Sequence, residues 1–258
     1  MPYATNEGIR IHYEVDGDGP PLVLQHGFTG KVKSWELAGY IDALKSHFRL
    51  IRVDARGHGE SDKPHETAAY TLSAHANDVV AVLDALDLRT AHFWGYSMGG
   101  WIGFGMAKYA SQRVAALVIG GAQPYGRTLR TSRPDGSDPQ AFLQDLFGRL
   151  GIQALDALPS NRRAELLAND FLALAAAQQD RPSLEDVLPT MHMPCCLYVG
   201  EADGILKQVE ACVKQIPNAT FVSFPRLDHA DAFYRSDVVL PPILHFLVAH
   251  TQRAQLVT

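Results

Sequence analysis

The feature that most constrains the fold is the pentapeptide Gly95-Tyr96-Ser97-Met98-Gly99, which fits the pattern G-x-S-x-G. A short apolar run at 91–94 precedes it and is typical of a buried strand, whereas 98–109 has a helical period. A chain that passes from strand to helix this quickly must turn sharply, which places the serine in a strained backbone conformation. The two glycines remove side chains that would collide as strand and helix close on each other. The pattern predicts that Ser97 is a nucleophile exposed at the carboxyl edge of a sheet.

Strand-like runs and helical periods alternate over much of the chain. Residues 9–15 alternate apolar and polar side chains, as a half-exposed strand does. Short apolar runs lie at 22–24, 50–53, 91–94, 114–119, 196–199 and 220–224. Helical periods lie at 72–86, with Ser73 as its N-cap, at 98–109 and at 238–249. This alternation predicts an α/β fold with a parallel sheet and right-handed crossovers.

The alternation stops between about residues 123 and 193. A loop-like stretch is followed by Ala- and Leu-rich helical segments at 142–158 and 162–178. Because this insertion is too large for a simple crossover, we predict a helical cap over one end of the sheet. The expected division is core at 1–123, cap at 124–193 and core again at 194–258. The alternative is that these helices only cover a face of the sheet.

Composition and charge limit the kinds of partner and the cellular compartment that we expect for the chain. The chain has 258 residues, with 23 Lys plus Arg against 28 Asp plus Glu, so its formal charge is −5. A mildly acidic chain without a basic stripe is not typical of a nucleic-acid binder. We find no secretory leader and no run of about 18 apolar residues, and therefore expect no membrane span. Cys195, Cys196 and Cys212 lack a CxxC pattern and are expected to be buried, which favours a cytoplasmic protein.

Two loops are expected to support the serine. His26-Gly27-Phe28 follows the strand at 22–25 and can aim a backbone N–H at the space above Ser97. Together, the N–H groups of Phe28 and Met98 would form an oxyanion hole, in which each donor is worth about 3 kcal/mol. We interpret His26 as a structural residue that holds its loop. The segment 54–61, rich in glycine and charge, is typical of a packed, hydrogen-bonded turn.

Taken together, the HG loop, the 54–61 turn, the 95–99 elbow and the late Asp and His resemble the α/β-hydrolase superfamily. The resemblance covers nearly the whole chain apart from the cap. It implies an eight-stranded, mostly parallel sheet flanked by helices, with a helical cap inserted after the sixth strand. It also implies that the catalytic groups follow one another as nucleophile, acid and histidine.

This order directs the search for the base to the late histidines. His245 and His250 fall on the last amphipathic helix, where a solvated or satisfied histidine is more typical. His229 lies in a loop just after the last strand run, where the family places its base. Members of the family often have glycine directly before this histidine, whereas this chain has Asp228, with Asp231 also near. Either carboxylate can raise the pKa of the imidazole or face water.

For the acid, the match to the family is Asp203, in the loop after the strand at 196–199. Glu201 is the alternative because it lies only two residues away. Some members carry the acid one strand earlier, but the corresponding segment 120–123 has no carboxylate. The serine in the elbow argues against the haloalkane dehalogenases and epoxide hydrolases of this fold, which attack with a carboxylate.

The resemblance implies a carboxylesterase-like serine hydrolase. Ser97 would attack an acyl carbonyl while His229 removes its proton and Asp203 orients the histidine, and an acyl-enzyme would follow. We expect a small-molecule ester with small to medium apolar groups, and no metal or organic cofactor. Candidate pocket residues are Trp35, Tyr96 and Tyr125.

Two other classes of function stay open at this point. The same three residues could serve C–C bond hydrolysis, lactone opening or cofactor-free perhydrolysis. The chain could instead be a non-catalytic hydrolase relative that binds a small ligand.

Overall fold

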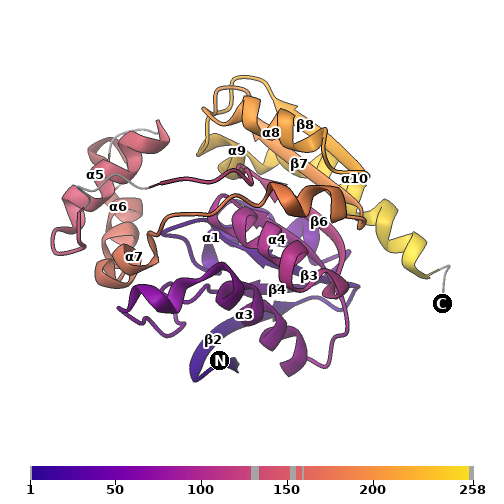
Figure 1. Cartoon of the computed structure of the whole chain (residues 1–258), viewed down its shortest axis with the longest axis horizontal. Coiled ribbons are helices and arrows are strands. Elements are labelled where there is room, and N and C mark those ends of the chain that lie inside the picture. The colour runs from indigo at the N-terminus through magenta and orange to yellow at the C-terminus, as the bar shows by residue number, and fades with distance from the viewer. Residues whose placement is uncertain (1, 129–133, 152–154, 159, 256–258) are drawn as a thin grey trace.

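The fold is built on a single sheet of eight strands (Figure 1). The computed structural model describes all residues except 1, 129–133, 152–154, 159 and 256–258. The strands lie in the order β1-β2-β4-β3-β5-β6-β7-β8. Their bounds are Tyr3–Asn6, Ile9–Asp16, Pro21–Gln25, Arg49–Val53, Ala91–Tyr96, Val114–Gly120, Cys195–Gly200 and Ala219–Phe224, from β1 to β8. The pairs β1–β2 and β2–β4 are antiparallel, and the other pairs are parallel. The predicted eight-stranded, mostly parallel sheet is therefore confirmed.

The strand β1 has no counterpart among the sequence predictions. Its residues pair one to one with residues 9–12 of β2 across a two-residue turn at Glu7 and Gly8, both with positive φ. Such a turn matches the twist of a hairpin. The four residues of β1 are mostly polar or exposed at the sheet edge. A short polar strand carries no apolar run, so the pattern that revealed the buried strands does not reveal it.

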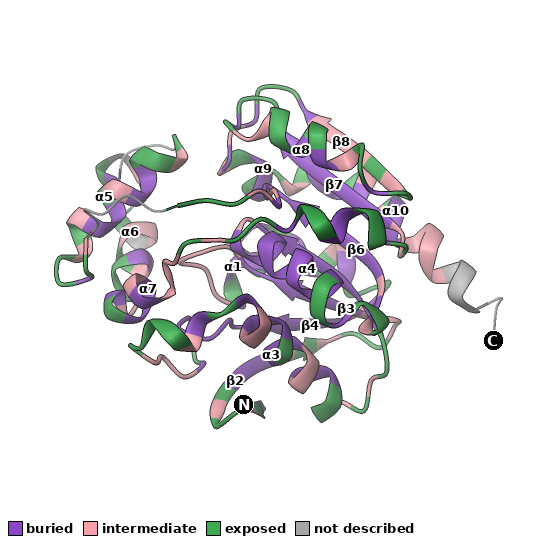
Figure 2. Cartoon of the chain, in the orientation of Figure 1, coloured by how far each residue is buried: buried purple, intermediate pink, exposed green. Residues whose placement is uncertain are grey.

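Helices cover both faces of the sheet, with one apolar core on each side. One core takes residues from α3 (Leu72–Ala85), α4 (Met98–Tyr109) and α8 (Leu206–Val213). The other takes residues from helices on the opposite face. These are α1 (Lys33–Leu37), α2 (Ile41–Leu44), α9 (Asp231–Tyr234) and α10 (Ser236–Gln255). Figure 2 shows the central strands as buried, because both faces of the sheet are covered, and α4 is buried from Met98 to Ala107.

The segment between β6 and β7 folds into a separate group of helices beside the sheet (Figure 1). It contains α5 (Pro139–Leu150), η3 (Leu155–Ala157), α6 (Ser160–Leu167) and α7 (Phe171–Ala177), followed by the 3₁₀ helix η4 (Glu185–Thr190). The apolar side chains of α5, η3, α6 and α7 form a third core, whereas those of η4 join the core beside α3 and α4. The helical insertion after β6, the sixth strand along the chain, is confirmed as part of the fold. The boundaries 124 and 193 stay predictions.

Three helix predictions need correction. The helix expected at 142–158 ends earlier, because Gly151 adopts a left-handed conformation that caps α5. The helix expected at 162–178 is two helices, because the Asp170 carboxylate accepts the Ala173 N–H and starts α7. The N-cap of α3 is Thr71 rather than Ser73, since the Thr71 hydroxyl accepts the Ala74 N–H.

The remaining 3₁₀ helices, η1 (Thr67–Tyr70) and η2 (Ser111–Arg113), lie at the ends of connections. All three cysteines are buried and free, as expected. Within the described residues, no helix is long and apolar enough to cross a membrane.

His92 on β5 is a buried histidine whose protonation state the fold determines. Its Nε2 lies 2.8 Å from Thr251 Oγ1, and Thr251 donates to the Leu247 carbonyl, so His92 Nε2 is the donor. Its Nδ1 is buried with no hydrogen-bond partner in the described part of the chain. Burial, together with His250, lowers the pKa of His92 from 6.5 to about 4. The folded protein therefore resists a proton that the unfolded chain takes up below about pH 6.5.

We expect His92→Leu to reduce the loss of stability on acidification. The depressed pKa means that unfolding takes up a proton between about pH 6.5 and 4, which lowers the free energy of unfolding by up to about 1.4 kcal/mol per pH unit. Urea unfolding at pH 7 and pH 5 measures this difference for wild type and variant. His47→Gln, at an exposed histidine, is the control. An identical pH dependence in wild type and His92→Leu would contradict the assignment.

Candidate active site

Ser97 occupies a strained turn between β5 and α4. Its φ is +52°, in the left-handed region that residues with a Cβ rarely adopt. The Ser97 N–H donates to the Gly120 carbonyl at 2.8 Å, and the Ser97 carbonyl accepts the Trp101 N–H at 3.0 Å. The neighbouring strand and the first turn of the helix thus hold the strained residue on both sides.

The glycines of the elbow allow direct backbone contact. A Cβ on Gly95 would lie 2.0 Å from the Gly99 carbonyl oxygen. A Cβ on Gly99 would lie 2.1 Å from the carbonyl oxygen of Gln25, at the end of β3. Both distances are far below van der Waals contact, so side chains are excluded here. The expectation that these glycines let strand and helix close agrees with this geometry.

The structure brings Ser97, His229 and Asp203 into one hydrogen-bonded chain. Ser97 Oγ lies 3.0 Å from His229 Nε2, and His229 Nδ1 lies 2.6 Å from Asp203 Oδ2. The three residues follow β5, β8 and β7, so the carboxyl ends of three parallel strands bring them together. Asp203 and His229 are buried, whereas Ser97 is half-buried. The hydroxyl is therefore within reach of a molecule that approaches from this edge.

The alternative residues take other partners. Glu201 is exposed, and its Oε1 accepts the Ser223 hydroxyl at 2.9 Å. His245 is exposed on α10, and His250 donates to the Phe246 carbonyl of the same helix at 2.8 Å. None of these contacts leads toward Ser97.

Asp228, which stands where the family often has glycine, orders the loop of His229. Its Oδ1 accepts the N–H groups of both Ala230 and Asp231 at 2.8 Å. A carboxylate that accepts two successive N–H groups fixes the turn that follows it. Asp228 therefore holds the backbone on both sides of His229, and Asp231 begins α9.

The HG loop passes beside the elbow. A Cβ on Gly27 would be 3.4 Å from Ser97 Cβ, so the loop backbone lies against the serine. No hydrogen bond from the N–H of Phe28 or Met98 to another described residue is present. Met98 also begins α4, so its N–H belongs to the positive end of the helix dipole. These two donors stay our prediction for an oxyanion hole.

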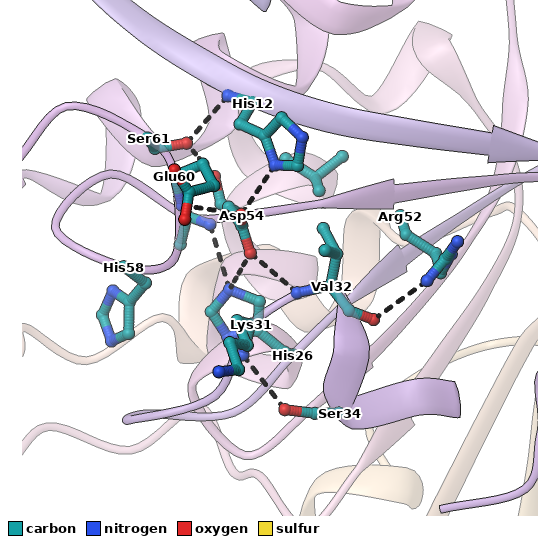
Figure 3. Close-up of polar contacts among 12 residues, drawn as sticks. His12, His26, Lys31, Val32, Ser34, Arg52, Asp54, His58, Glu60 and Ser61 are labelled. Carbon is teal, nitrogen blue, oxygen red and sulfur yellow. Dashed lines mark hydrogen bonds and ion pairs between the residues drawn. The ribbon is translucent and has the colours of Figure 1, made fainter. Parts of the chain in front are cut away.

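A buried carboxylate, Asp54, ties this loop to the sheet (Figure 3). It accepts the N–H groups of Val32 at 2.7 Å and Glu60 at 2.9 Å, and the Nδ1–H of His12 at 2.7 Å. Ser61 extends the network, because its hydroxyl donates to the Asp54 carbonyl at 2.7 Å. The predicted hydrogen-bonded turn at 54–61 is present.

His26 belongs to the same network and not to the Ser97 chain. Its Nδ1 donates to the Gly27 carbonyl at 2.8 Å, and its Nε2 accepts the Ala55 N–H at 3.1 Å. Both ring nitrogens are therefore used by backbone, which fixes a neutral tautomer. Burial lowers the pKa of His26, in agreement with that state. The interpretation of His26 as a structural residue fits these contacts.

The three candidate pocket residues lie in different surroundings. Trp35 is fully buried and packs edge-on against Tyr40, Trp94 and Phe233, so it belongs to the core and not to a pocket. Tyr96 is also buried, behind His229, and its hydroxyl donates to the His229 carbonyl at 2.5 Å. The Tyr125 hydroxyl lies 3.4 Å from Gln215 Nε2 near the end of α8. The sequence shows that these side chains are aromatic, but not whether each one packs in the core or lines a pocket.

The helices inserted after β6 contact the HG loop. The Phe28 ring stacks on Phe142 at 6.4 Å, and Phe142 packs edge-on against Phe171 at 5.4 Å. Asn169 Nδ2 donates to the Thr29 carbonyl at 3.4 Å. The loop beside Ser97 therefore has an apolar roof made by α5 and α7.

Comparison with known proteins shows the family to which the chain belongs. A family model described as the alpha/beta hydrolase fold matches residues 20–194, more than half of the chain. The chain belongs to the alpha/beta hydrolase fold family. The structure of an enol-lactonase from Burkholderia xenovorans LB400 is similar, with a TM-score of 0.80, 23% identity and coverage of 95% of this chain and 99% of that one. At this identity the likeness shows the fold alone.

Two curated relatives of this alpha/beta hydrolase carry different names. A Bacillus subtilis (strain 168) protein provisionally named 2-succinyl-6-hydroxy-2,4-cyclohexadiene-1-carboxylate synthase is 28% identical, over 87% of this chain and 90% of its own. A non-heme chloroperoxidase from Streptomyces lividans is also 28% identical, over 94% of this chain and 98% of its own. Membership of the family therefore does not specify one reaction.

The elbow contact predicts opposite effects for two Gly→Ala changes. Gly99→Ala would force a Cβ into the Gln25 carbonyl, and we expect it to lower the free energy of unfolding by about 3 kcal/mol. Gly148→Ala is the matched control, since Gly148 is exposed within α5 and an added Cβ would meet nothing within 4 Å. It should stabilise the protein by about 0.5–1 kcal/mol. Urea unfolding measures both, and wild-type stability in Gly99→Ala would refute the contact.

Proposed function

We propose that the chain is a serine hydrolase that cleaves carboxylic esters with small to medium apolar groups. The observation that carries the proposal is the hydrogen-bonded chain of Ser97, His229 and Asp203, with links of 3.0 and 2.6 Å. A serine hydroxyl is a weak nucleophile unless a base removes its proton as it attacks. Here a histidine nitrogen lies within hydrogen-bond reach of the hydroxyl, and a buried carboxylate holds the opposite nitrogen.

The roles follow from the donors and acceptors. Asp203 accepts the Nδ1–H of His229, which leaves Nε2 as the acceptor for the Ser97 proton. Ser97 Oγ then bonds to the acyl carbon, and Asp203 stabilises the imidazolium that forms. The N–H groups of Phe28 and Met98 would receive the negative carbonyl oxygen.

Collapse of this intermediate breaks the bond to the alcohol oxygen, which takes the proton from His229. Water then attacks the acyl-enzyme with His229 as base, and the carboxylic acid leaves.

The surroundings of Ser97 favour an apolar substrate. The rings of Phe28, Phe142 and Phe171 connect the loop beside Ser97 to the core of the inserted helices. Apolar walls with a few convergent polar groups are typical of small-molecule sites. The names of the relatives differ from one another, so they do not choose the substrate. An ester is the substrate for which these residues supply every step, and a lactone is an ester in a ring.

Replacing the nucleophile provides the first test. We expect Ser97→Ala to lower the turnover of p-nitrophenyl esters by about 10⁴-fold or more, because the attacking oxygen is lost. Initial rates from acetate to long acyl chains measure this, and the chain-length optimum gives the depth of the acyl site. Ser223→Ala is the control, since it removes a half-buried hydroxyl on β8 that donates to Glu201.

The possible outcomes separate the candidate reactions. Unchanged rates in Ser97→Ala would show that the nucleophile is another residue. A folded wild type that is inert on all linear esters but opens lactones would replace the ester assignment with the lactone one.

The acid can be assigned by a pair of isosteric changes. Asp203→Asn keeps the shape but removes the acceptor that fixes the His229 tautomer, so kcat should fall by about 10³- to 10⁴-fold. Glu201→Gln alters a carboxylate two residues away that faces Ser223 instead, and its kcat should stay near that of the wild type. A larger loss in Glu201→Gln than in Asp203→Asn would reverse the assignment. The same ester assay measures both variants.

A further inference from the structure

Tyr96, the residue before Ser97, contacts the backbone of the candidate base, His229. Its side chain is buried, and its hydroxyl donates to the His229 backbone carbonyl at 2.5 Å across 133 residues of sequence. The two rings are 5.5 Å apart between centroids. We propose that Tyr96 is a positioning residue, which holds the backbone of His229 where its imidazole reaches Ser97 Oγ. This inference rests on the proposed function, in which His229 is the base.

The Tyr96 ring is itself held in place. It packs against Phe233 at 5.0 Å and Tyr198 at 5.9 Å between centroids. A Cβ on Gly121 would lie 2.8 Å from its hydroxyl oxygen, so the backbone of that residue closes over the end of the ring. A ring confined on these sides has one place for its hydroxyl. The hydroxyl is therefore a fixed reference point for the loop that it bonds.

The contact completes the restraints on the His229 loop. Asp228 fixes the turn through the N–H groups of Ala230 and Asp231, and Asp203 fixes the imidazole through Nδ1. Tyr96 holds the carbonyl of His229 itself. Since Tyr96 and Ser97 are consecutive, the nucleophile and the restraint on its base share one rigid piece of backbone.

The hydroxyl is suited to permanent donation. Burial, followed by the nearby Asp203, raises the pKa of Tyr96 well above its ordinary value of 10. The phenol therefore keeps its proton throughout the range in which a histidine base is neutral. Phenylalanine would keep the ring but leave a buried carbonyl without its donor, and the loop could then shift to find another.

Tyr40 offers a matched control. It is fully buried, and its hydroxyl donates to the Phe233 carbonyl at 2.9 Å. Phe233 is in α9, four residues after His229. Both tyrosines lie in the same apolar core. Tyr40→Phe thus removes the same kind of hydrogen bond to the same stretch of chain, but not the one to His229.

The experiment compares Tyr96→Phe with Tyr40→Phe in two assays. The first is the rate at which a fluorophosphonate labels Ser97, which needs the activated serine but no particular substrate. The second is kcat and KM on the best p-nitrophenyl ester. We expect Tyr96→Phe to lose roughly 10- to 100-fold in labelling rate and kcat with little change in KM, as small displacements of catalytic groups do. Tyr40→Phe should lose as much thermal stability as Tyr96→Phe but keep the wild-type kcat.

A rescue variant separates the donor from the ring. Incorporation of 4-aminophenylalanine at position 96 restores an N–H donor at the same place and should restore most of the rate. Where Tyr96→Phe does not fold, 4-fluorophenylalanine fills the volume without a donor and takes its place in the comparison.

Three results would overturn the inference. Wild-type labelling and kcat in Tyr96→Phe would show that the bond does not position His229. An equal loss in Tyr40→Phe would show a general packing effect. A wild type that no fluorophosphonate labels would refute the catalytic use of Ser97 and the role of Tyr96 with it, whereas the first two results leave Ser97 in place.

Discussion

The site depends on one direct contact between backbones, where the first turn of α4 meets the ends of β3 and β5. No side chain fits between Gly99 and the Gln25 carbonyl or between Gly95 and the Gly99 carbonyl. This closeness forces the chain through a positive φ at Ser97, and two backbone hydrogen bonds retain it there. It also brings the HG loop against the serine. The position of Ser97 is therefore a property of the sheet and α4, and not of a flexible loop.

A second constraint acts below the HG loop. Asp54 is a buried carboxylate whose oxygens bond three segments, namely β2, the loop before α1 and the 54–61 turn. A buried charge is costly unless it is hydrogen-bonded, and both carboxylate oxygens of Asp54 have partners. Burial lowers the pKa of His26 and brings that of His58 to about 3, so these two histidines beside the HG loop stay neutral.

Local chemistry explains which features the sequence predicts. The elbow, the buried strands and the 54–61 turn depend on neighbouring residues, so their patterns are visible in the chain. The edge strand β1 depends on pairing with β2, and the break at Asp170 depends on a single cap. Asp203 and His229 have no local signature, and only the chain order implied by the family selects them. Trp35 is predicted as a pocket residue but is fully buried in the core, because the sequence does not show whether an aromatic side chain lines a pocket or packs in the interior.

The three proposed catalytic residues and the apolar roof come from separate parts of the fold. Ser97, Asp203 and His229 lie at the ends of β5, β7 and β8, and their supports are buried in the two cores of the sheet. The apolar roof above the HG loop comes from helices with a core of their own. These helices reach the rest of the chain through Phe28, through His65, which bonds Asp170, and through Tyr234, on which Arg162 stacks. Changes in the helices can therefore reshape the roof while the strand ends keep their own packing. This separation gives a physical reason why relatives of similar identity, each matched over most of its length, carry names for different reactions.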